Sequence, residues 1–459
     1  MIIQNAHTPI LRRNAAPTQA AGNESSRVSG DTFQLSQQPP AQQPPAQQPP
    51  AEQPPAQQPV PPQQPPAPPQ PELKDWTVLI YSVSDNNLYT YMQSDLDEAE
   101  RVGSTNEMTV LAETSHQPRG GNVVRVKLET DSTPGLKSPV LQDLGKTHDM
   151  AKSENLANSI AWAMKEYPSK HFFLVCSDHG AGWKGAHHSE STDSWMNATD
   201  LEAGLKSAQE QTGRKIDVIG FDECLMASAE IGHQLKDYAN YMVASEEVEG
   251  GAGWQYDEAL GKQSNGNSRV MSGKVLNYAA AALRARDPLT PADMAKAVVS
   301  MAEGHQRDLG TMSAIDLSKM GNVSAALDNF AGKVIDANIA PKDFAPIAQQ
   351  AQKFYDFADA GHLVQLAGAK FGGEIADAAA QVKAALGEAV IAEQHSQKYP
   401  NATGLNIEYR KQAAAPGLTD DMQIPNMSPE DQSRMKMNPY HTTKFAQETR
   451  WDEMLRKVR

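Results

Sequence analysis

Short apolar runs alternate with amphipathic stretches along the chain from residue 75 to about residue 265. The runs at 76–83, 172–176 and 216–221 are rich in β-branched and aromatic residues, which favours buried strands. The last two do not alternate with polar residues, as is typical of parallel strands covered on both faces. Apolar residues at helical spacing separate the runs, at 88–102, 153–167, 199–211 and 225–239. The pattern predicts an α/β fold with a mainly parallel sheet and helices on both faces.

Three further strands are expected at 108–112, 122–128 and 241–245, and the second of them starts a small hairpin. Ser153 is expected to cap the helix at 153–167. Beyond residue 265 the chain is alanine-rich and helical in pattern, at 275–285, 291–303, 319–336, 342–358 and 373–395. One late strand at 403–409 and a docking helix near the end of the chain complete the prediction. We therefore expect an α/β domain at 73–264 and a helical C-terminal region, 265–459, packed on it.

The first 72 residues differ in composition from the rest of the chain. Residues 37–71 are a near-repeat of Pro-Pro-Ala-Gln-Gln. Such a segment cannot bury enough apolar surface to offset its ordering entropy, so a disordered leader with an extended polyproline linker is expected. The tract is either a passive spacer or a ligand for an aromatic groove on an unknown partner.

Charge and composition narrow the function classes. The formal net charge of −15 argues against a nucleic-acid partner, because phosphate binding needs a basic face, and it suits cationic peptides. Two cysteines in 459 residues cannot form a disulfide framework or a four-cysteine zinc site. No apolar run is long enough to span a membrane, and the N-terminus lacks the pattern of a general signal peptide. The expected location is cytoplasmic, or outside the cell by a specialised export route.

Two strands end in residues that can do chemistry together. His179 follows the run at 172–176, and Cys224 follows the run at 216–221. Ligands bind beyond the carboxyl ends of strands in open α/β sheets, so we expect the two side chains to face one cleft. Cys224 stands where a strand gives way to a predicted helix, whose N-terminus would stabilise a thiolate, and His179 would exchange its proton. A buried, inert thiol is the other interpretation for Cys224, and Cys176, inside an apolar run, is expected to be core.

Two neighbouring patterns suggest other sites. Residues 180–185 fit the G-x-G-x-x-G pattern of dinucleotide sites, which would make the chain a nucleotide-binding α/β protein. That pattern requires a helix to begin there, whereas the continuation is polar and without period. His187 and His188 point in different directions with no cysteine nearby, so we expect a solvated loop rather than a metal site.

Two motifs resemble a known family. Asp-His-Gly-Ala-Gly-Trp at 178–183 and Ile-Gly-Phe-Asp-Glu-Cys-Leu-Met-Ala at 219–227 resemble the catalytic motifs of the clostripain family of cysteine peptidases, relatives of caspases, gingipains and legumain. The similarity runs from about residue 73 to about residue 456. It is supported by further matching stretches at 76–81, 85–88, 241–247, 253–254, 311–318, 355–358 and 451–453.

The resemblance implies a caspase-like fold and a catalytic domain at 73–264. It implies that Cys224 is the nucleophile, that His179 protonates the leaving amine, and that the N–H groups of Gly180 and Cys224 bind the oxyanion. Asp222 would line the specificity pocket and select Arg or Lys, so the expected partners are peptides and proteins with basic residues. Glu223 departs from the family, in which a small residue usually stands at this place.

The resemblance also bears on processing and cofactors. Some family members cut themselves after a basic residue between the two motifs, and Lys184, in a loop expected to be mobile, is the best candidate. No cofactor or metal is expected. Calcium stimulation, known for some relatives, stays open although the sequence shows no calcium loop of the EF-hand type. A catalytically inactive peptidase fold that acts as a scaffold through its Pro/Gln tract is the alternative function. The intact set of His179, Gly180, Asp222 and Cys224 argues against it.

Overall fold

The computed structural model describes residues 73–116, 120–256, 289–302, 310–410 and 440–458, together with Leu276, Ala280 and Leu283. All of them belong to one compact unit, Gln70–Arg459. The leader, its Pro/Gln tract and most of the helix expected at 275–285 lie outside the described residues. Within the described residues, no helix is both long and apolar enough to cross a membrane.

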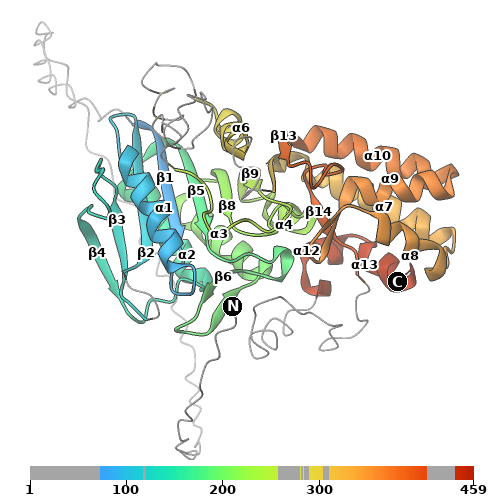
Figure 1. Ribbon diagram of the computed structural model, residues 1–459, viewed down its shortest axis with the longest axis horizontal. Coiled ribbons are helices and arrows are strands. Elements are labelled where there is room, and N and C mark those ends of the chain that lie inside the picture. The colour runs from blue at the N-terminus through green and yellow to red at the C-terminus, as the bar shows by residue number, and fades with distance from the viewer. Residues whose placement is uncertain are drawn as a thin grey trace, which may run out of the picture. The chain divides into compact units, whose positions relative to one another are not determined.

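A nine-stranded sheet forms the centre of this unit (Figure 1). Its strands are β1 (Lys74–Ser82), β2 (Met108–Ser115), β3 (Val123–Lys127), β4 (Val140–Gly145), β5 (Ser169–Ser177), β8 (Ile216–Asp222), β9 (Ala239–Ala244), β10 (Thr311–Asp316) and β13 (Val390–His395). They lie in the order β13-β10-β9-β8-β5-β1-β2-β3-β4. Strands β9, β8, β5, β1 and β2 are parallel, and both edges of the sheet are antiparallel. The mainly parallel α/β sheet is therefore confirmed.

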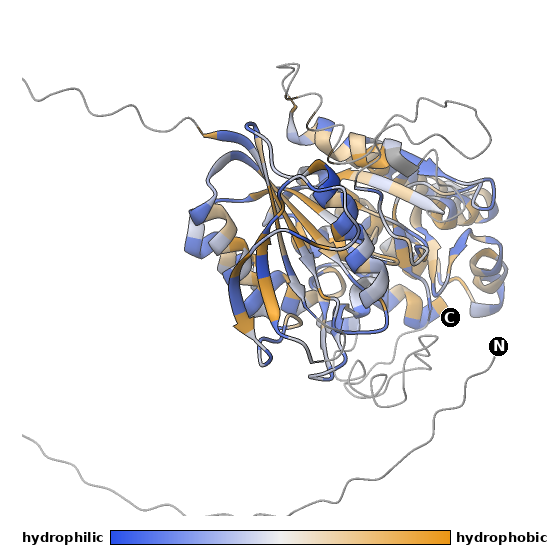
Figure 2. Ribbon diagram, turned by 60° about the vertical axis from the view of Figure 1, so that its left-hand side comes forward, coloured by the Kyte–Doolittle hydropathy of each residue, from blue (hydrophilic) through white to orange (hydrophobic). Residues whose placement is uncertain are grey.

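Helices cover both faces of the sheet, and the strands show why. Val78 and Ile80 of β1 share a buried cluster with Leu96 of α1 (Tyr89–Val102) and with α6 (Pro291–Ala302). Leu79 and Tyr81 point to the other face, where the cluster includes residues of α2 (Ser153–Glu166), α3 (Ala198–Thr212) and α4 (Ala229–Leu235). Both side-chain directions are buried, so the apolar runs are continuous. Figure 2 shows hydrophobic residues along these strands and hydrophilic residues on the outer helix faces.

The part beyond residue 265 is less helical than its sequence suggested. Between residues 291 and 389 the described helices are α6, α7 (Met320–Asp336), α8 (Pro341–Gln350), α9 (Ala360–Phe371) and α10 (Gly373–Ala389), with a short 3-10 helix η2 (Leu317–Lys319). The helix expected at 342–358 ends at Gln350, and β11 (Lys353–Phe354) and β12 (Phe357–Asp359) follow. The helix expected at 373–395 gives way to β13, because Val390 and the residues after it pair with β10. The region thus supplies two strands of the central sheet. The late strand is found as β14 (Asn406–Glu408), which pairs with β12.

Two local predictions near the strand ends are wrong. The polar loop expected after His179 is a 3-10 helix, η1 (Gly182–Lys184), and a hairpin of β6 (Ala186–Ser189) and β7 (Ser194–Met196). Ser153 is the first residue of α2 and does not cap it, since the N-cap residue is Lys152, without a side-chain bond.

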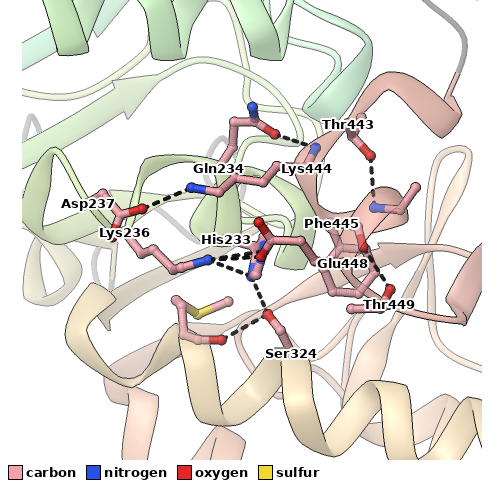
Figure 3. Close-up of polar contacts among 12 residues, drawn as sticks. His233, Gln234, Lys236, Asp237, Ser324, Thr443, Lys444, Phe445, Glu448 and Thr449 are labelled. Carbon is pink, nitrogen blue, oxygen red and sulfur yellow. Dashed lines mark hydrogen bonds and ion pairs between the residues drawn. The ribbon is translucent and has the colours of Figure 1, made fainter.

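Residues 440–458 form η3 (Tyr440–Thr442), α12 (Lys444–Glu448) and α13 (Trp451–Val458); α12 packs on α4, whereas α13 packs on α7 and α8. Figure 3 shows His233 of α4 against Glu448, with 2.8 Å between Nε2 and Oε2. The Lys444 N–H donates to Gln234 at 3.0 Å, and Trp451 Nε1 donates to the Glu408 carbonyl at 2.7 Å. Helix α4 follows β8 in the chain, so the contacts of α12 with α4 stabilise a helix that lies close to the candidate site.

Candidate active site

Three adjacent strands of the sheet end level with one another. Ser82 of β1 pairs with Ser177 of β5, and Ser177 pairs in turn with Asp222 of β8. The residues that follow, 83–87, 178–180 and 223–225, therefore leave the sheet at the same edge. In the sheet, β1 has β2 as its neighbour on one side and β5 on the other, so the order of strands reverses at β1. This edge is therefore the topological switch point, where open α/β sheets bind ligands. The structure thus brings the His179 and Cys224 segments together.

His179 is held by a residue that the sequence analysis did not single out. Its Nε2 lies 2.8 Å from Oδ1 of Asn87, which follows β1. An amide oxygen only accepts hydrogen bonds, so Nε2 carries the proton and Nδ1 is the free base. Burial, together with the neighbouring His188, lowers the pKa of His179 to about 4. The imidazole is therefore neutral at pH 7.

The turn that carries His179 is tied to its surroundings by Asp178 and Asn86. Asn86 Nδ2 donates to Asp178 Oδ1 at 2.6 Å and to the His188 carbonyl at 2.8 Å. The Asp178 carboxylate also accepts the His188 N–H. These bonds join the end of β1, the His179 turn and β6 into one unit. Asn86 and Asn87 thus act in the site, although the sequence indicated them only as part of a stretch that follows a strand and matches the family.

Cys224 is a neutral thiol in this arrangement. Its Sγ accepts the Glu249 N–H at 3.4 Å and lies 3.8 Å from the Glu249 carbonyl oxygen. Burial, together with the charge of Glu249, raises the pKa of the Cys224 thiol to about 12. Cys176, in contrast, is wholly buried in the core, as expected. Cys224 remains partly accessible, which is what a reactive thiol requires.

Gly180 makes the two motifs touch. A Cβ atom at this position would lie 2.4 Å from the Cys224 carbonyl oxygen and 2.9 Å from Glu223 Cβ, distances that no side chain tolerates. Glycine therefore permits the closest approach of the His179 turn to the Cys224 turn.

Cys224 does not stand at a helix N-terminus, so the expected stabilisation by a helix dipole is wrong. Helix α4 begins only at Ala229 and is capped by Ser228. Leu225 adopts a positive φ of 68°, a strained conformation for leucine. Asn406 of β14 holds this turn: its Nδ2 donates to the carbonyls of Leu225, at 3.1 Å, and Glu246, at 2.9 Å.

Asp222 belongs to a group of buried acidic residues. Its Oδ1 accepts the Trp254 N–H at 3.0 Å, and its Oδ2 accepts the Tyr256 hydroxyl at 2.9 Å. Burial raises the pKa of Asp222 to about 6, against the effect of these bonds. Burial, followed by the nearby Asp222 carboxylate, also raises the pKa values of Glu249 and Asp95 well above their usual range. Glu249 and Asp95 were not predicted from the sequence.

Lys184 does not lie in a mobile loop. Its side chain is 2 % exposed, with Nζ 2.7 Å from Asp356 Oδ2 and 5.1 Å from the ring centre of Phe357. A protease needs an accessible, extended segment, so the folded chain offers no cleavage site there. The glycine pattern at 180–185 also opens no α-helix, which removes the structural basis for a dinucleotide site.

Glu223 lies against His187 of β6, which is wholly buried rather than part of a solvated loop. The Glu223 Oε1 and His187 Nε2 atoms are 3.1 Å apart, and both side chains are 0 % exposed.

Three comparisons place this geometry among known proteins. The model of the clostripain family matches residues 80–457. The curated protein Clostripain of Hathewaya histolytica is 23 % identical over 308 residues, which cover 57 % of this chain and 57 % of that protein. The chain thus matches little more than half the length of this relative.

Solved structures of low sequence identity share the fold. The secreted C11 cysteine protease "iotapain" of Bacteroides thetaiotaomicron aligns with a TM-score of 0.57 and 16 % identity, over 84 % of this chain and 100 % of that chain. An inactive zymogen C11 protease from Parabacteroides distasonis aligns with a TM-score of 0.51 and 20 % identity, over 73 % and 92 % of the two chains. These likenesses confirm the caspase-like α/β fold.

Proposed function

Because the chain belongs to the clostripain family, we propose that it is a cysteine endopeptidase that cleaves peptides after Arg or Lys. Cys224 is the nucleophile, and His179 carries the proton. The observation that supports this most directly is the contact of the two turns at Gly180, beside a histidine whose Nε2 is fixed by Asn87.

The first step forms a bond from Cys224 Sγ to the carbonyl carbon of the scissile peptide. The thiol proton passes to His179 Nδ1, which is the unprotonated nitrogen. Both groups are neutral beforehand, so proton transfer accompanies attack instead of preceding it. The N–H groups of Gly180 and Cys224 stabilise the negative oxygen that forms.

The second half of the reaction releases the two products. The imidazolium donates its proton to the leaving amine as the C–N bond breaks, which leaves a thioester on Cys224. Water then attacks the thioester, and His179 takes a proton from that water. The carboxylic acid product leaves, and the proton returns to the thiol. Each of these steps uses groups of the protein alone. Calcium, which stimulates some relatives, would act outside them, and the cleavage rate with and without a chelator tests whether it does.

The preference for Arg or Lys follows from the buried acids. The Asp222 carboxylate raises the pKa values of both Glu249 and Asp95, and burial raises all three, so deprotonating all of them is costly. A guanidinium or ammonium group that enters beside them would remove this cost and form charge-assisted bonds. Arg fits best, because its planar fork donates two parallel hydrogen bonds to one carboxylate.

A peptide-library cleavage profile tests the proposal. The wild type should cut after Arg and Lys, whereas Cys224→Ala and His179→Ala should abolish cleavage. Cys176→Ala is the matched control and should retain activity, because that thiol is core. A folded wild type that cuts no peptide, and whose Cys224 resists a basic chloromethyl ketone, would favour the scaffold function instead.

A further inference from the structure

The pair formed by Glu223 and His187 is buried between the two catalytic turns. Glu223 precedes Cys224 directly, and its Cβ lies against Gly180. His187 comes from β6, in the hairpin that follows the His179 turn. The distance of 3.1 Å between Oε1 and Nε2 is one that a hydrogen bond spans.

The backbone of β6 is distorted in a way that directs His187 inwards. Ala186 pairs with Met196 and His188 pairs with Trp195, so His187 is an extra residue in its strand. Its φ of 53° is in the left-handed region, which a histidine adopts at a cost on the order of 1 kcal/mol. Bulges of this kind change the direction of a side chain and are frequent beside active sites. The ring lies 5.4 Å from that of Tyr81 and reaches Glu223.

The two groups depend on each other. Neither ring nitrogen of His187 and neither carboxyl oxygen of Glu223 makes a hydrogen bond of good geometry to any residue that the structure describes, so the 3.1 Å contact of Oε1 and Nε2 is the close polar approach that joins the two side chains. Burial and the nearby Asp222 carboxylate raise the pKa of Glu223 well above its usual range, and burial lowers the pKa of His187 to about 3. Both groups are therefore uncharged at neutral pH, and each faces the other at 3.1 Å in this buried site. Loss of either side chain leaves the other without that polar neighbour.

We propose that Glu223 and His187 are a positioning pair that fixes the His179 turn against the Cys224 turn. Glu223 extends the Cys224 turn, while His187 is covalently joined to His188, whose N–H and carbonyl bind Asp178 and Asn86. A shift of either turn must therefore move the other. The inference rests on the proposed peptidase function.

The geometry also excludes a role for Glu223 in choosing the substrate. Its side chain is 0 % exposed and lies against His187, so it cannot contact a substrate side chain in this arrangement. Asp222 has separate partners, Trp254 and Tyr256. Removing the pair should therefore change the rate of the chemical step and leave the preference for Arg over Lys unchanged.

Four variants test the pair: Glu223→Ala, Glu223→Gln, His187→Asn and the double variant Glu223→Ala/His187→Asn. Asn tolerates the left-handed backbone, so His187→Asn removes the imidazole without adding strain. Glu223→Gln keeps the shape and a polar group facing Nε2. His233→Ala is the control. It also removes a buried histidine that contacts a glutamate, Glu448, but His233 lies on α4 and not in either catalytic turn (Figure 3).

The kinetics of peptide cleavage decide the outcome. We expect kcat to fall about 10- to 100-fold in Glu223→Ala and His187→Asn, with KM little changed and no further loss in the double variant. Glu223→Gln should stay within about threefold of the wild type, and so should the control. Alkylation of Cys224 by iodoacetamide, which needs no peptide binding, should slow in parallel.

Three results would overturn the positioning role of the pair. They are a wild-type kcat in a folded Glu223→Ala, additive losses of kcat in the double variant, or a changed ratio of Arg to Lys cleavage in any of these variants. If Glu223→Ala does not fold, as judged by its thermal transition, the two single variants His187→Asn and Glu223→Gln still test the role: kcat should fall in the first and stay near the wild-type value in the second. An inactive wild type would instead overturn the proposed function, and the alkylation rates would still report on the pair.

Discussion

Asn87 Oδ1 lies 2.8 Å from His179 Nε2, although 92 residues separate the two in the chain. This bond selects the tautomer of the imidazole and leaves Nδ1 free to accept a proton. Asn87 touches no reacting atom, so it is a positioning residue.

Two replacements of Asn87 should have different effects on kcat and on the pH dependence of the rate. Asn87→Ala removes the acceptor, and we expect kcat to fall about 10- to 100-fold with the pH profile little moved. Asn87→Asp places a negative charge beside the ring and favours the imidazolium, so the pKa of His179 should rise. The acidic limb of the rate profile should then move to higher pH by about one unit. A profile unchanged in Asn87→Asp would contradict the contact.

The two pKa values of the dyad predict how Cys224 reacts with a small alkylating agent. The His179 pKa is lowered to about 4 and the Cys224 pKa is raised to about 12, so between these values both groups are neutral and no thiolate is preformed. The rate of reaction with iodoacetamide should rise steadily above pH 8 and show no plateau between pH 5 and 7. Cys224→Ala supplies the background rate. A plateau at acidic pH would mean that a thiolate–imidazolium pair forms in the free protein.

The buried acids predict a charge-dependent loss of activity. Asp222→Asn should lower kcat/KM for an Arg substrate by about 10- to 100-fold, because a charge-assisted bond is lost. Glu249→Gln should have a smaller effect in the same direction. A substrate with citrulline in place of Arg has the same shape without the charge, and its slower cleavage should change little in either variant. Equal losses for both substrates would show that Asp222 acts through the fold instead.

The C-terminal segment predicts a change of stability. Trp451 is wholly buried, and its Nε1 donates to the Glu408 carbonyl. Trp451→Ala removes a large side chain from the core and leaves that carbonyl without its donor, so the free energy of unfolding should fall by about 3–5 kcal/mol. Urea denaturation followed by circular dichroism measures it. Tyr91→Ala is the matched control, since that aromatic side chain is exposed and its loss should cost little.

Features of the site that depend on local sequence could be predicted. The continuous apolar runs of β5 and β8 mark central parallel strands, and the polar residues after them mark the ligand-binding edge. His179, Cys224 and the core position of Cys176 follow from that reading. Helical pattern alone placed α1, α2 and α3 close to their true bounds, because each is amphipathic along its whole length.

Features that depend on distant partners could not be predicted. The pattern at 225–239 suits a helix, yet Asn406 binds the carbonyl of Leu225, whose backbone is left-handed, and the Ser245 carbonyl accepts the Ala227 N–H, so the helix begins only at Ala229. The pattern at 373–395 is continuous, yet β10 draws its end into the sheet. His187 is polar and stands in a polar stretch, and nothing nearby in the sequence indicates the bulge that buries it. In each case a tertiary contact overrides the local preference.

The Asn406 contact has a consequence for the order of events during synthesis. Leu225 and Asn406 are 181 residues apart, and the amide of the later residue holds the strained turn beside the thiol. A chain that emerges from the ribosome N-terminus first exposes Cys224 and His179 long before Asn406 arrives. The turn then lacks the contact that stabilises it, so the nascent chain should be inactive until Asn406 has been made and has folded onto the turn. Late completion of the site would protect the ribosome and neighbouring nascent chains from cleavage.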